Sequence, residues 1–380
     1  MIEEAYLEDE RLHRPHHDRP PAGAPLLEIR GLTTVFNTEM GVLRAVDGVS
    51  FEVRAGEVLA VVGESGCGKT VTAMSILGLI PQPAGKIVAG EILYRGEDLV
   101  GMAPHRLRQI RGDRIAMIFQ DPLTALNPVY RVGDQIAEVI LAHRKVSKAA
   151  AFKQAVELLD LVGIPNPPER ARHYPHEFSG GMRQRAMIAM GVALDPDLLI
   201  ADEPTTALDV TVQAQILEVL LEVQSRLGSA ILLITHDLGV VAEVANRVMV
   251  MYAGKKVEEG DVDTIFDHPK HPYTWGLLAS TTRADEPLLD RMFQIPGAPP
   301  SLIHPPPACR FAPRCPFVQE VCRTDYPDPA MVVPGHEVAC HFAGDEGWTM
   351  ELMGTVGGDR PAEHTTTARA ESPLDKGPAA

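Results

Sequence analysis

The sequence contains no long apolar run. Its longest runs, Ala230–Thr235 and Val248–Ala253, have the length of a strand, whereas a helix that crosses a bilayer needs about 20 mostly apolar residues. The first residues are acidic and no apolar signal core follows them, so we do not expect secretion. Any role at a membrane is therefore expected to depend on partner subunits.

Positive charge is also scarce. The chain has 35 Lys and Arg residues against 51 Asp and Glu residues, which gives a net charge of −16. Proteins that bind nucleic acid through its phosphates need a basic surface, and attachment to anionic lipid needs basic clusters as well. The composition therefore predicts no nucleic-acid partner and argues against direct docking on anionic lipid.

Cysteine is rare, and four of the five cysteines are close together in the sequence. Cys309, Cys315, Cys322 and Cys340 are separated by 5, 6 and 17 residues, which is not the short spacing of common zinc knuckles. In a chain without a secretion signal, such a cluster favours a metal site over disulfides. Four thiolates can hold either zinc or an iron–sulfur cluster, and the spacing leaves both open.

Short apolar segments alternate with helix-patterned segments, which predicts an α/β fold with a parallel sheet. A helix is expected over Lys69–Leu79, and residues 130–225 are mostly helix-patterned with an interruption near Pro165–Pro168. The expected strands are Leu27–Leu32, Val49–Val53, Val58–Val62, Ile115–Phe119, Leu198–Ala201, Ala230–Thr235 and Val248–Tyr252.

A glycine-rich loop follows the predicted strand Val58–Val62 and leads into a predicted helix. This context and the final Lys-Thr pair match the phosphate-binding P-loop pattern and disfavour a chance glycine-rich turn. Backbone N–H groups and the helix N-terminus attract phosphate, Lys69 is expected to reach the β and γ phosphates, and Thr70 to hold Mg²⁺. Cys67 is expected to fill a small position, not to act as a nucleophile. The loop consists of Gly63, Glu64, Ser65, Gly66, Cys67, Gly68, Lys69 and Thr70.

Two carboxylates end the apolar segment Leu198–Ala201. Asp202 and Glu203 are thereby delivered to the carboxyl edge of the predicted sheet, where α/β proteins bind ligands. Asp202 suits the magnesium shell. Glu203 points to the other side of the chain and suits a general base that polarises the attacking water. The alternative is that the two carboxylates simply end a strand in solvent. The presence of a P-loop in the same sequence disfavours this alternative.

Three further segments identify a family. They are Phe178–Arg185, with the sequence FSGGMRQR, Ile118–Pro122, with IFQDP, and Thr235–Asp237, with THD. Together with the P-loop and the acid pair, they make the sequence resemble the ATP-binding subunits of ABC transporters. Phe178 stands where Leu is usual in the signature and Met182 where Gln is usual, and both variants look like those of the peptide-importer branch.

The resemblance implies a fold and a set of roles. The fold is a P-loop ATPase cassette with a RecA-like α/β core, an antiparallel β subdomain and a helical subdomain. Two cassettes are expected to pair head to tail around ATP. The resemblance implies that Phe36 stacks on adenine and that Gln120 of the Q-loop touches Mg²⁺ together with Thr70 and Asp202. His236 is the implied switch histidine, which holds Glu203 and the attacking water in line, and Asp209 belongs to the D-loop. The signature, which acts on the ATP of the partner cassette, consists of Ser179, Gly180, Gly181 and Met182.

The C-terminal part resembles the extension of oligopeptide and dipeptide importer ATPases. The segments that carry this likeness are His271–Thr274, Ile295–Pro300 and the four cysteines with His341. The resemblance favours a structural [4Fe–4S] cluster on Cys309, Cys315, Cys322 and Cys340, with zinc or metal-free cysteines as alternatives, and His341 is not expected to be a ligand. Residues 1–25 and 343–380 are expected to be disordered, 26–262 to form the cassette with a helical subdomain at about 122–190, and 263–342 to form the extension.

The expected function is ATP hydrolysis that energises uptake of di- and oligopeptides, with ATP and Mg²⁺ as cofactors. The implied partners are two transmembrane permease subunits, a second ATPase subunit in a heterodimer and an extracellular solute-binding protein, and the implied location is the cytoplasmic face of the cell membrane. Import of nickel chelates or oligosaccharides by the same machinery stays open. A soluble ABC ATPase outside transport is a distant alternative, because the chain has a single cassette and no heptad array.

Overall fold

An eight-stranded sheet forms the centre of the computed structural model, which describes residues 20–206, 208–280 and 294–345. Most of the predicted terminal extensions therefore lies outside the described residues. From one edge to the other, the strands are β11 (Ala330–Val333), β12 (His336–Val338), β10 (Lys255–Asp261), β9 (Arg247–Tyr252), β3 (Val58–Val62), β8 (Ala230–Ile234), β7 (Leu198–Asp202) and β6 (Ile115–Ile118).

The strands from β9 to β6 run parallel to one another. Strands β3, β7 and β8 are buried at every position, and their sequences are continuously apolar up to Asp202, as expected of strands covered by protein on both faces. The predicted parallel arrangement is therefore confirmed for the strands expected at Val58–Val62, Ile115–Phe119, Leu198–Ala201, Ala230–Thr235 and Val248–Tyr252, whereas β10, β11 and β12 were not predicted.

A second sheet is antiparallel, with the order β2 (Gly41–Arg54), β1 (Pro25–Thr38), β4 (Gly85–Tyr94) and β5 (Glu97–Asp98). Strands β1 and β2 are much longer than predicted. Register shifts interrupt their pairing, and these bulges break the alternation of apolar residues that a strand prediction relies on. Strand β4 was not predicted, and it contains Gly90 at φ 95°, a residue that lowers strand propensity.

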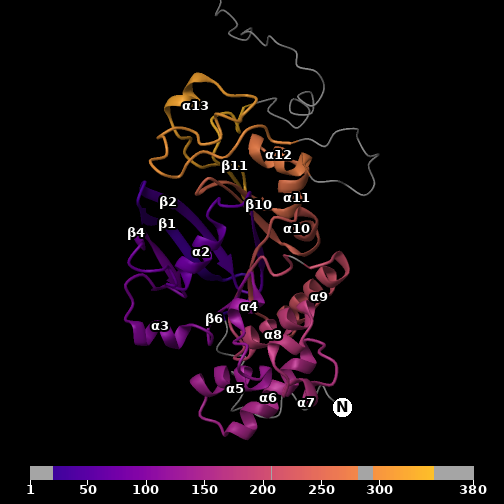
Figure 1. Cartoon of the computed structure of the whole chain (residues 1–380). Helices are drawn as coiled ribbons and strands as arrows, with labels where there is room; N and C mark the ends of the chain where they lie inside the picture. Colours follow the sequence, from indigo (N-terminus) through magenta and orange to yellow (C-terminus); the bar gives the residue numbers. More distant parts are fainter. Residues whose placement is uncertain (1–19, 207, 281–293, 346–380) are drawn as a thin grey trace, which may run out of the picture.

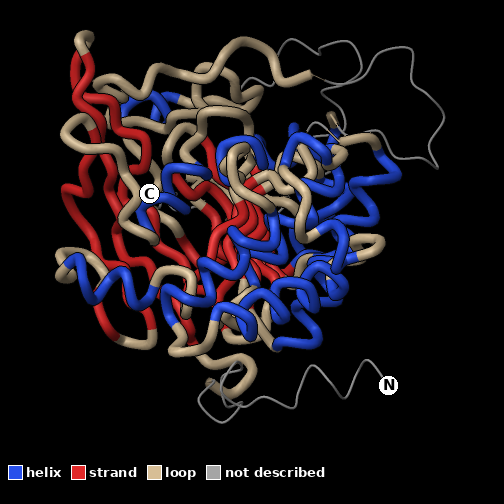
Figure 2. Tube along the Cα trace, turned by 60° about the horizontal axis from the view of Figure 1, so that its bottom comes forward, coloured by secondary structure: helices blue, strands red, loops and turns tan. Residues whose placement is uncertain are grey.

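The helices cover this framework, and Figures 1 and 2 show them concentrated on one side of the strands, with α5, α6 and α7 at one end of the molecule. Within the described ranges, none of them combines the length and the apolar character that crossing a bilayer requires. They are α2 (Lys69–Ile76), α3 (Pro104–Ile110), α4 (Pro122–Ala125), α5 (Val132–His143), α6 (Lys148–Leu161), α7 (Pro167–Arg170), the 3₁₀ helix Pro175–Glu177, α8 (Gly180–Val192), α9 (Val210–Leu227), α10 (Leu238–Val244), α11 (Val262–Asp267), α12 (Pro272–Ala279) and α13 (Glu320–Thr324).

One helix prediction needs correction. Helix α2 ends at Ile76, three residues before the predicted end, because Gly78 at φ 60° turns the chain. The predicted interruption near Pro165–Pro168 is confirmed, since α6 ends at Leu161 and α7 begins at Pro167. Proline fits the first turn of a helix, where its missing N–H has no partner to lose.

The C-terminal segment joins the central sheet and its core. Strand β12 pairs with β10 and carries β11 at its outer edge. Below the sheet, the rings of Tyr252 from β9, Tyr273 from α12 and Phe311 lie 4.5 to 5.5 Å apart between centroids, a range in which aromatic pairs attract. The cysteine-bearing segment is therefore packed against the parallel sheet.

Glu258 links three parts of this region. Its carboxylate accepts hydrogen bonds from the backbone N–H groups of Lys270 at 2.6 Å and His271 at 3.1 Å and lies 2.8 Å from Nε2 of His336. The Glu258 side chain is fully buried. A buried carboxylate is tolerated when donors satisfy it, and here the donors come from the start of α12 and from β12.

We predict that Glu258→Ala lowers the free energy of unfolding by about 3 kcal/mol, because three buried donors lose their acceptor. Urea denaturation of the full chain measures the change. Glu97→Ala is the matched control, since the Glu97 side chain is half exposed and lies 3.6 Å from Arg106. Equal stability of the two variants would contradict the linking role of Glu258.

Candidate active site

Four of the predicted motifs follow neighbouring strands. Strands β3, β8, β7 and β6 are adjacent and parallel, so their carboxyl ends lie at one edge of the sheet. The phosphate loop follows β3, His236 follows β8, Asp202 ends β7 and Gln120 follows β6. Ligands of open α/β sheets bind at this edge, and the sequence motifs meet there.

The phosphate loop depends on two glycines. A Cβ atom on Gly63 would lie 2.2 Å from the carbonyl oxygen of Met251, and one on Gly68 would lie 2.4 Å from that of Ala45. Gly68 also has φ 107° and precedes α2, a conformation that glycine adopts without strain. These close approaches hold the loop in its curled shape at the start of the helix.

Lys69 reaches across this loop. Its Nζ donates to the carbonyl oxygens of Gly63 at 2.7 Å and Glu64 at 3.2 Å, and the side chain is 5% exposed.

Burial also raises the pKa of the neighbouring Cys67 thiol, so Cys67 is uncharged at neutral pH and fills the small buried position that the sequence predicted.

Thr70 and Asp202 form a second polar contact at this edge. The Thr70 hydroxyl donates to Oδ1 of Asp202 at 3.1 Å. Burial raises the pKa of Asp202 to about 6, and the negative charge of Glu203 adds to this effect, although the Thr70 hydrogen bond opposes it. Hydroxyl and carboxylate oxygens are the ligands that Mg²⁺ prefers, so the pair has the chemistry of a magnesium site.

Glu203 is the common acceptor of the site. Its Oε2 accepts from Gln120 Nε2 at 3.0 Å and from the Thr206 hydroxyl at 2.9 Å, and it lies 3.6 Å from Nδ1 of His236. Glu203 has φ 47°, and this left-handed turn, uncommon for a residue other than glycine, separates its side chain from that of Asp202. The structure thus brings Gln120, Glu203 and His236 together.

The signature residues form the start of another helix. Ser179 caps α8, and its hydroxyl accepts from the Met182 backbone N–H at 3.3 Å. Ser179 and Gly180 are exposed. Figure 1 shows α8 among the helices and α2 beside the antiparallel strands. The Ser179 hydroxyl bonds within α8, whereas the described partners of the Glu203 carboxylate are Gln120, Thr206 and His236. Asp209 likewise caps α9 by accepting from Val212 N–H at 3.0 Å.

Phe36 lies on β1, half-buried, and a Cβ atom on Gly85 would approach its ring to 2.6 Å. Gly85 therefore gives the ring its space at the end of β4.

Thr206 was not singled out from the sequence. Thr206 lies three residues after Glu203, about one turn further along the chain. This spacing of a hydroxyl residue from the acid pair is the only signal for it in the sequence.

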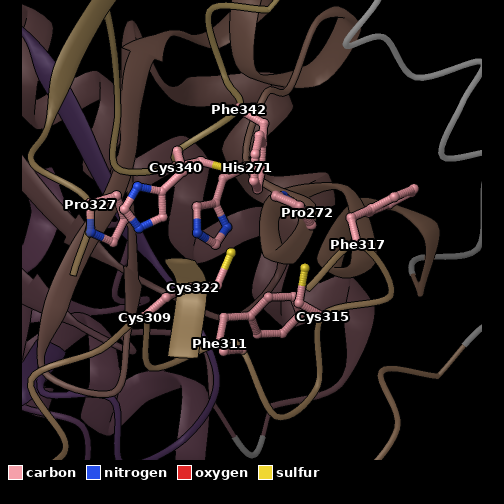
Figure 3. A pocket seen from close by; sticks show the side chains of 12 residues that line it. His271, Pro272, Cys309, Phe311, Cys315, Phe317, Cys322, Pro327, Cys340 and Phe342 are labelled. Atoms are coloured by element: carbon pink, nitrogen blue, oxygen red, sulfur yellow. The ribbon is translucent and has the colours of Figure 1, made fainter. Parts of the chain in front are cut away.

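The four clustered cysteines line one cavity together with His271, Phe311 and Phe317. Its volume is about 20 Å³, room for about one water molecule. Figure 3 shows the sulfur atoms of Cys315, Cys322 and Cys340 around the His271 side chain. Burial raises the pKa of Cys315 and of Cys340 to about 12 and lowers that of His271 to about 4, so these three side chains are uncharged at pH 7.

This arrangement bears on the predicted metal site. The thiols have the donor chemistry of a soft-metal site, and all four line one cavity. Among the residues that the structure describes, however, no group of three or more His, Cys, Asp or Glu side chains has the geometry to hold a metal ion. The structure therefore does not support the predicted cluster, and the lining side chains would have to move outward to admit one.

Comparisons with known proteins agree with the geometry of the site. Residues 46–206 match the ABC transporter family, and residues 257–322 match the C-terminal region of oligopeptide/dipeptide transporters. A probable peptide ABC transporter ATP-binding protein of Sinorhizobium fredii is 52% identical over 84% of this chain and 96% of its own length. The dipeptide transport ATP-binding protein DppD of Bacillus subtilis is 53% identical over 83% of this chain and 94% of its own.

Solved structures show the same fold. A dimeric bacterial ABC transporter cassette matches with a TM-score of 0.56 at 26% identity, over 62% of this chain and 99% of its own. A cassette from Clostridium perfringens, part of a transporter complex, matches with a TM-score of 0.54 at 26% identity, over 64% of this chain and 91% of its own. The predicted cassette fold is confirmed by these matches.

Proposed function

The chain belongs to the ATP-binding subunits of ABC transporters of the oligopeptide/dipeptide type, and from this membership we propose that it hydrolyses ATP to drive the uptake of di- and oligopeptides. The observation that carries the proposal is the meeting of the phosphate loop, Asp202, Glu203, Gln120 and His236 at one edge of the parallel sheet.

The residues of this edge divide the work of phosphoryl transfer, which is mostly positioning and charge stabilisation. Lys69 exchanges its loop carbonyls for the β and γ phosphates. Thr70 and Asp202 hold Mg²⁺, with Gln120 as a further ligand. Glu203 orients and deprotonates the attacking water, and His236 holds both in line. Phe36 stacks on the adenine.

A second cassette completes the site. Ser179 and Gly180 stand exposed at the start of α8, and a helix N-terminus attracts phosphate. They act on the ATP held by a partner cassette, with Met182 and Asp209 at the same interface. Hydrolysis then depends on closure of the pair, and ATP favours the closed state because both faces bind it.

The membrane part of the transporter comes from other chains. The partners are two permease subunits, a sister ATPase and an extracellular solute-binding protein, and this chain works at the cytoplasmic face of the membrane. Residues 121–128 after Gln120 lie next to the nucleotide site and include Leu123, which is 61% exposed. They carry the nucleotide state to the permease.

The first test is Glu203→Gln. Loss of a general base lowers kcat by about 100-fold or more, while the intact phosphate loop still binds ATP and the closed pair persists. ATPase assays measure the first effect and size-exclusion chromatography with MgATP the second. In cells, uptake of a labelled tripeptide should fall to the level of a strain without the gene.

Glu222→Gln is the matched control, because Glu222 is exposed on α9 and pairs only with Arg226 at 2.6 Å among the described side chains. It should leave turnover and uptake unchanged. Normal turnover of Glu203→Gln would show that Glu203 is not the base. Normal turnover without tripeptide uptake in the native chain would exclude the peptide substrate while keeping the ATPase.

The second test is Gly180→Asp. The nearest atom to a Cβ there is Cδ2 of Leu208 at 3.8 Å, so a side chain fits without disturbing the fold. The carboxylate would repel the partner's γ phosphate, so we predict loss of ATP hydrolysis with unchanged binding of MgADP. Gly180→Ala is the control for added bulk. Full activity of Gly180→Asp would contradict the shared site.

We also propose that Cys309, Cys315, Cys322 and Cys340 bind a four-iron cluster that holds the C-terminal segment together. What supports this is the convergence of four thiols on one cavity. A metal bound by four residues that are spread along the segment stabilises a segment that has little apolar core of its own.

The cluster has a direct chemical test. Anaerobically purified protein should be brown and contain about four acid-labile sulfides per chain, and Cys322→Ser should lower both the colour and the melting temperature. Colourless protein with stoichiometric zinc would show that the four cysteines bind zinc and not an iron–sulfur cluster. Protein without either metal would reject the site.

A further inference from the structure

The first residue of the phosphate loop after Gly63 is held by the C-terminal segment. Glu64 is contacted through its side chain by Arg314 and through its backbone N–H by Tyr273. These two residues lie 250 and 209 positions away in the sequence. The nucleotide site and the cysteine-bearing segment are therefore joined at the loop itself.

Arg314 makes the stronger of the two contacts. Its Nη1 and Nη2 donate to the two carboxylate oxygens of Glu64 at 2.7 and 2.9 Å. Such a two-pronged, charge-assisted pair is strong and fixes the relative orientation of its partners. The guanidinium is itself held, since its Nε donates to the carbonyl oxygen of Pro296 at 2.9 Å. The Arg314 side chain is 5% exposed.

Tyr273 holds the backbone of the same residue. The Glu64 N–H donates to the Tyr273 hydroxyl at 2.8 Å, and the Tyr273 side chain is fully buried. This N–H therefore points away from the phosphate cradle. The carbonyl oxygen of Glu64 accepts from Lys69 Nζ at 3.2 Å, so every polar group of Glu64 has a partner and its peptide planes have a fixed direction.

We propose that Arg314 is a positioning residue for nucleotide binding, which fixes the entry of the phosphate loop through Glu64. The inference rests on the proposed function, because it assumes that this loop holds the phosphates of ATP. It adds that a residue one position before Cys315 sets the affinity for nucleotide.

The charge of the pair gives the proposal a specific signature. With Arg314 in place, the Glu64 carboxylate is neutralised. Without it, an unpaired negative charge stands beside the loop that must bind the phosphates, and like charges at short range repel. Removing Glu64's charge as well should therefore restore part of the lost affinity, which a purely structural role of Arg314 does not predict.

Arg310 provides the matched control. It comes from the same segment, is 4% exposed, and bonds to Asp47 and to the carbonyl oxygen of Ala253. It therefore fastens the C-terminal segment to the cassette without touching Glu64. Arg310→Met reports the effect of weaker docking, and Arg314→Met reports docking together with positioning.

The test measures the Kd of MgADP by calorimetry on the full chain, so no turnover is needed. Arg314→Met should raise Kd by about tenfold. Arg314→Lys should raise it by about threefold, because lysine keeps the positive charge but cannot donate to both carboxylate oxygens at once. The double variant Glu64→Gln/Arg314→Met should bind MgADP more tightly than Arg314→Met. Arg310→Met should leave Kd within about twofold, and KM for ATP should change in Arg314→Met more than kcat.

Three results would overturn the inference. The first is an unchanged Kd in Arg314→Met. The second is a double variant that binds no more tightly than Arg314→Met. The third is an equal loss in Arg314→Met and Arg310→Met, which would reduce Arg314 to a docking contact. If the native chain bound no MgADP at all, the proposed function itself would be wrong. Failure of the proposed function and failure of the role of Arg314 therefore give different results.

Discussion

The parallel register of β3, β8, β7 and β6 is the constraint on which the rest of the molecule depends. These strands are apolar on both faces and buried at nearly every position, so the hydrophobic effect fixes them in the middle of the protein. Asp202 pairs in register with Ile234. A slip of one residue would turn Asp202 away from Thr70 and would also carry Glu203 away from Gln120 and His236.

The parts of the site that follow these strands could be predicted from the sequence, because each is a local pattern. A strand, a glycine-rich turn and a helix are contiguous, and so are the apolar segment and the acid pair. The lengths of β1 and β2 could not be predicted in the same way, since bulges interrupt their alternation. The cap residues Ser179 and Asp209 were predicted for their family roles, and the structure adds that each begins a helix.

Contacts between distant segments escaped the sequence analysis. Arg314 stood next to a predicted metal ligand and Tyr273 in a family motif, but nothing in the sequence connects either with Glu64. The pairing of β10 with β12 and the burial of Glu258 are equally non-local. The cysteines show the intermediate case, because their clustering predicted a common metal site and the structure places them around one cavity, whereas the arrangement of the thiols within it could not be predicted from their spacing.

The contacts of Lys69 have a consequence for the shape of the phosphate loop. Its ammonium group donates to the carbonyl oxygens of Gly63 and Glu64, so the first residue of α2 is tied back to the beginning of the loop. These bonds close the loop on itself. The positive charge that suits Lys69 to phosphate thus also holds the backbone that surrounds it.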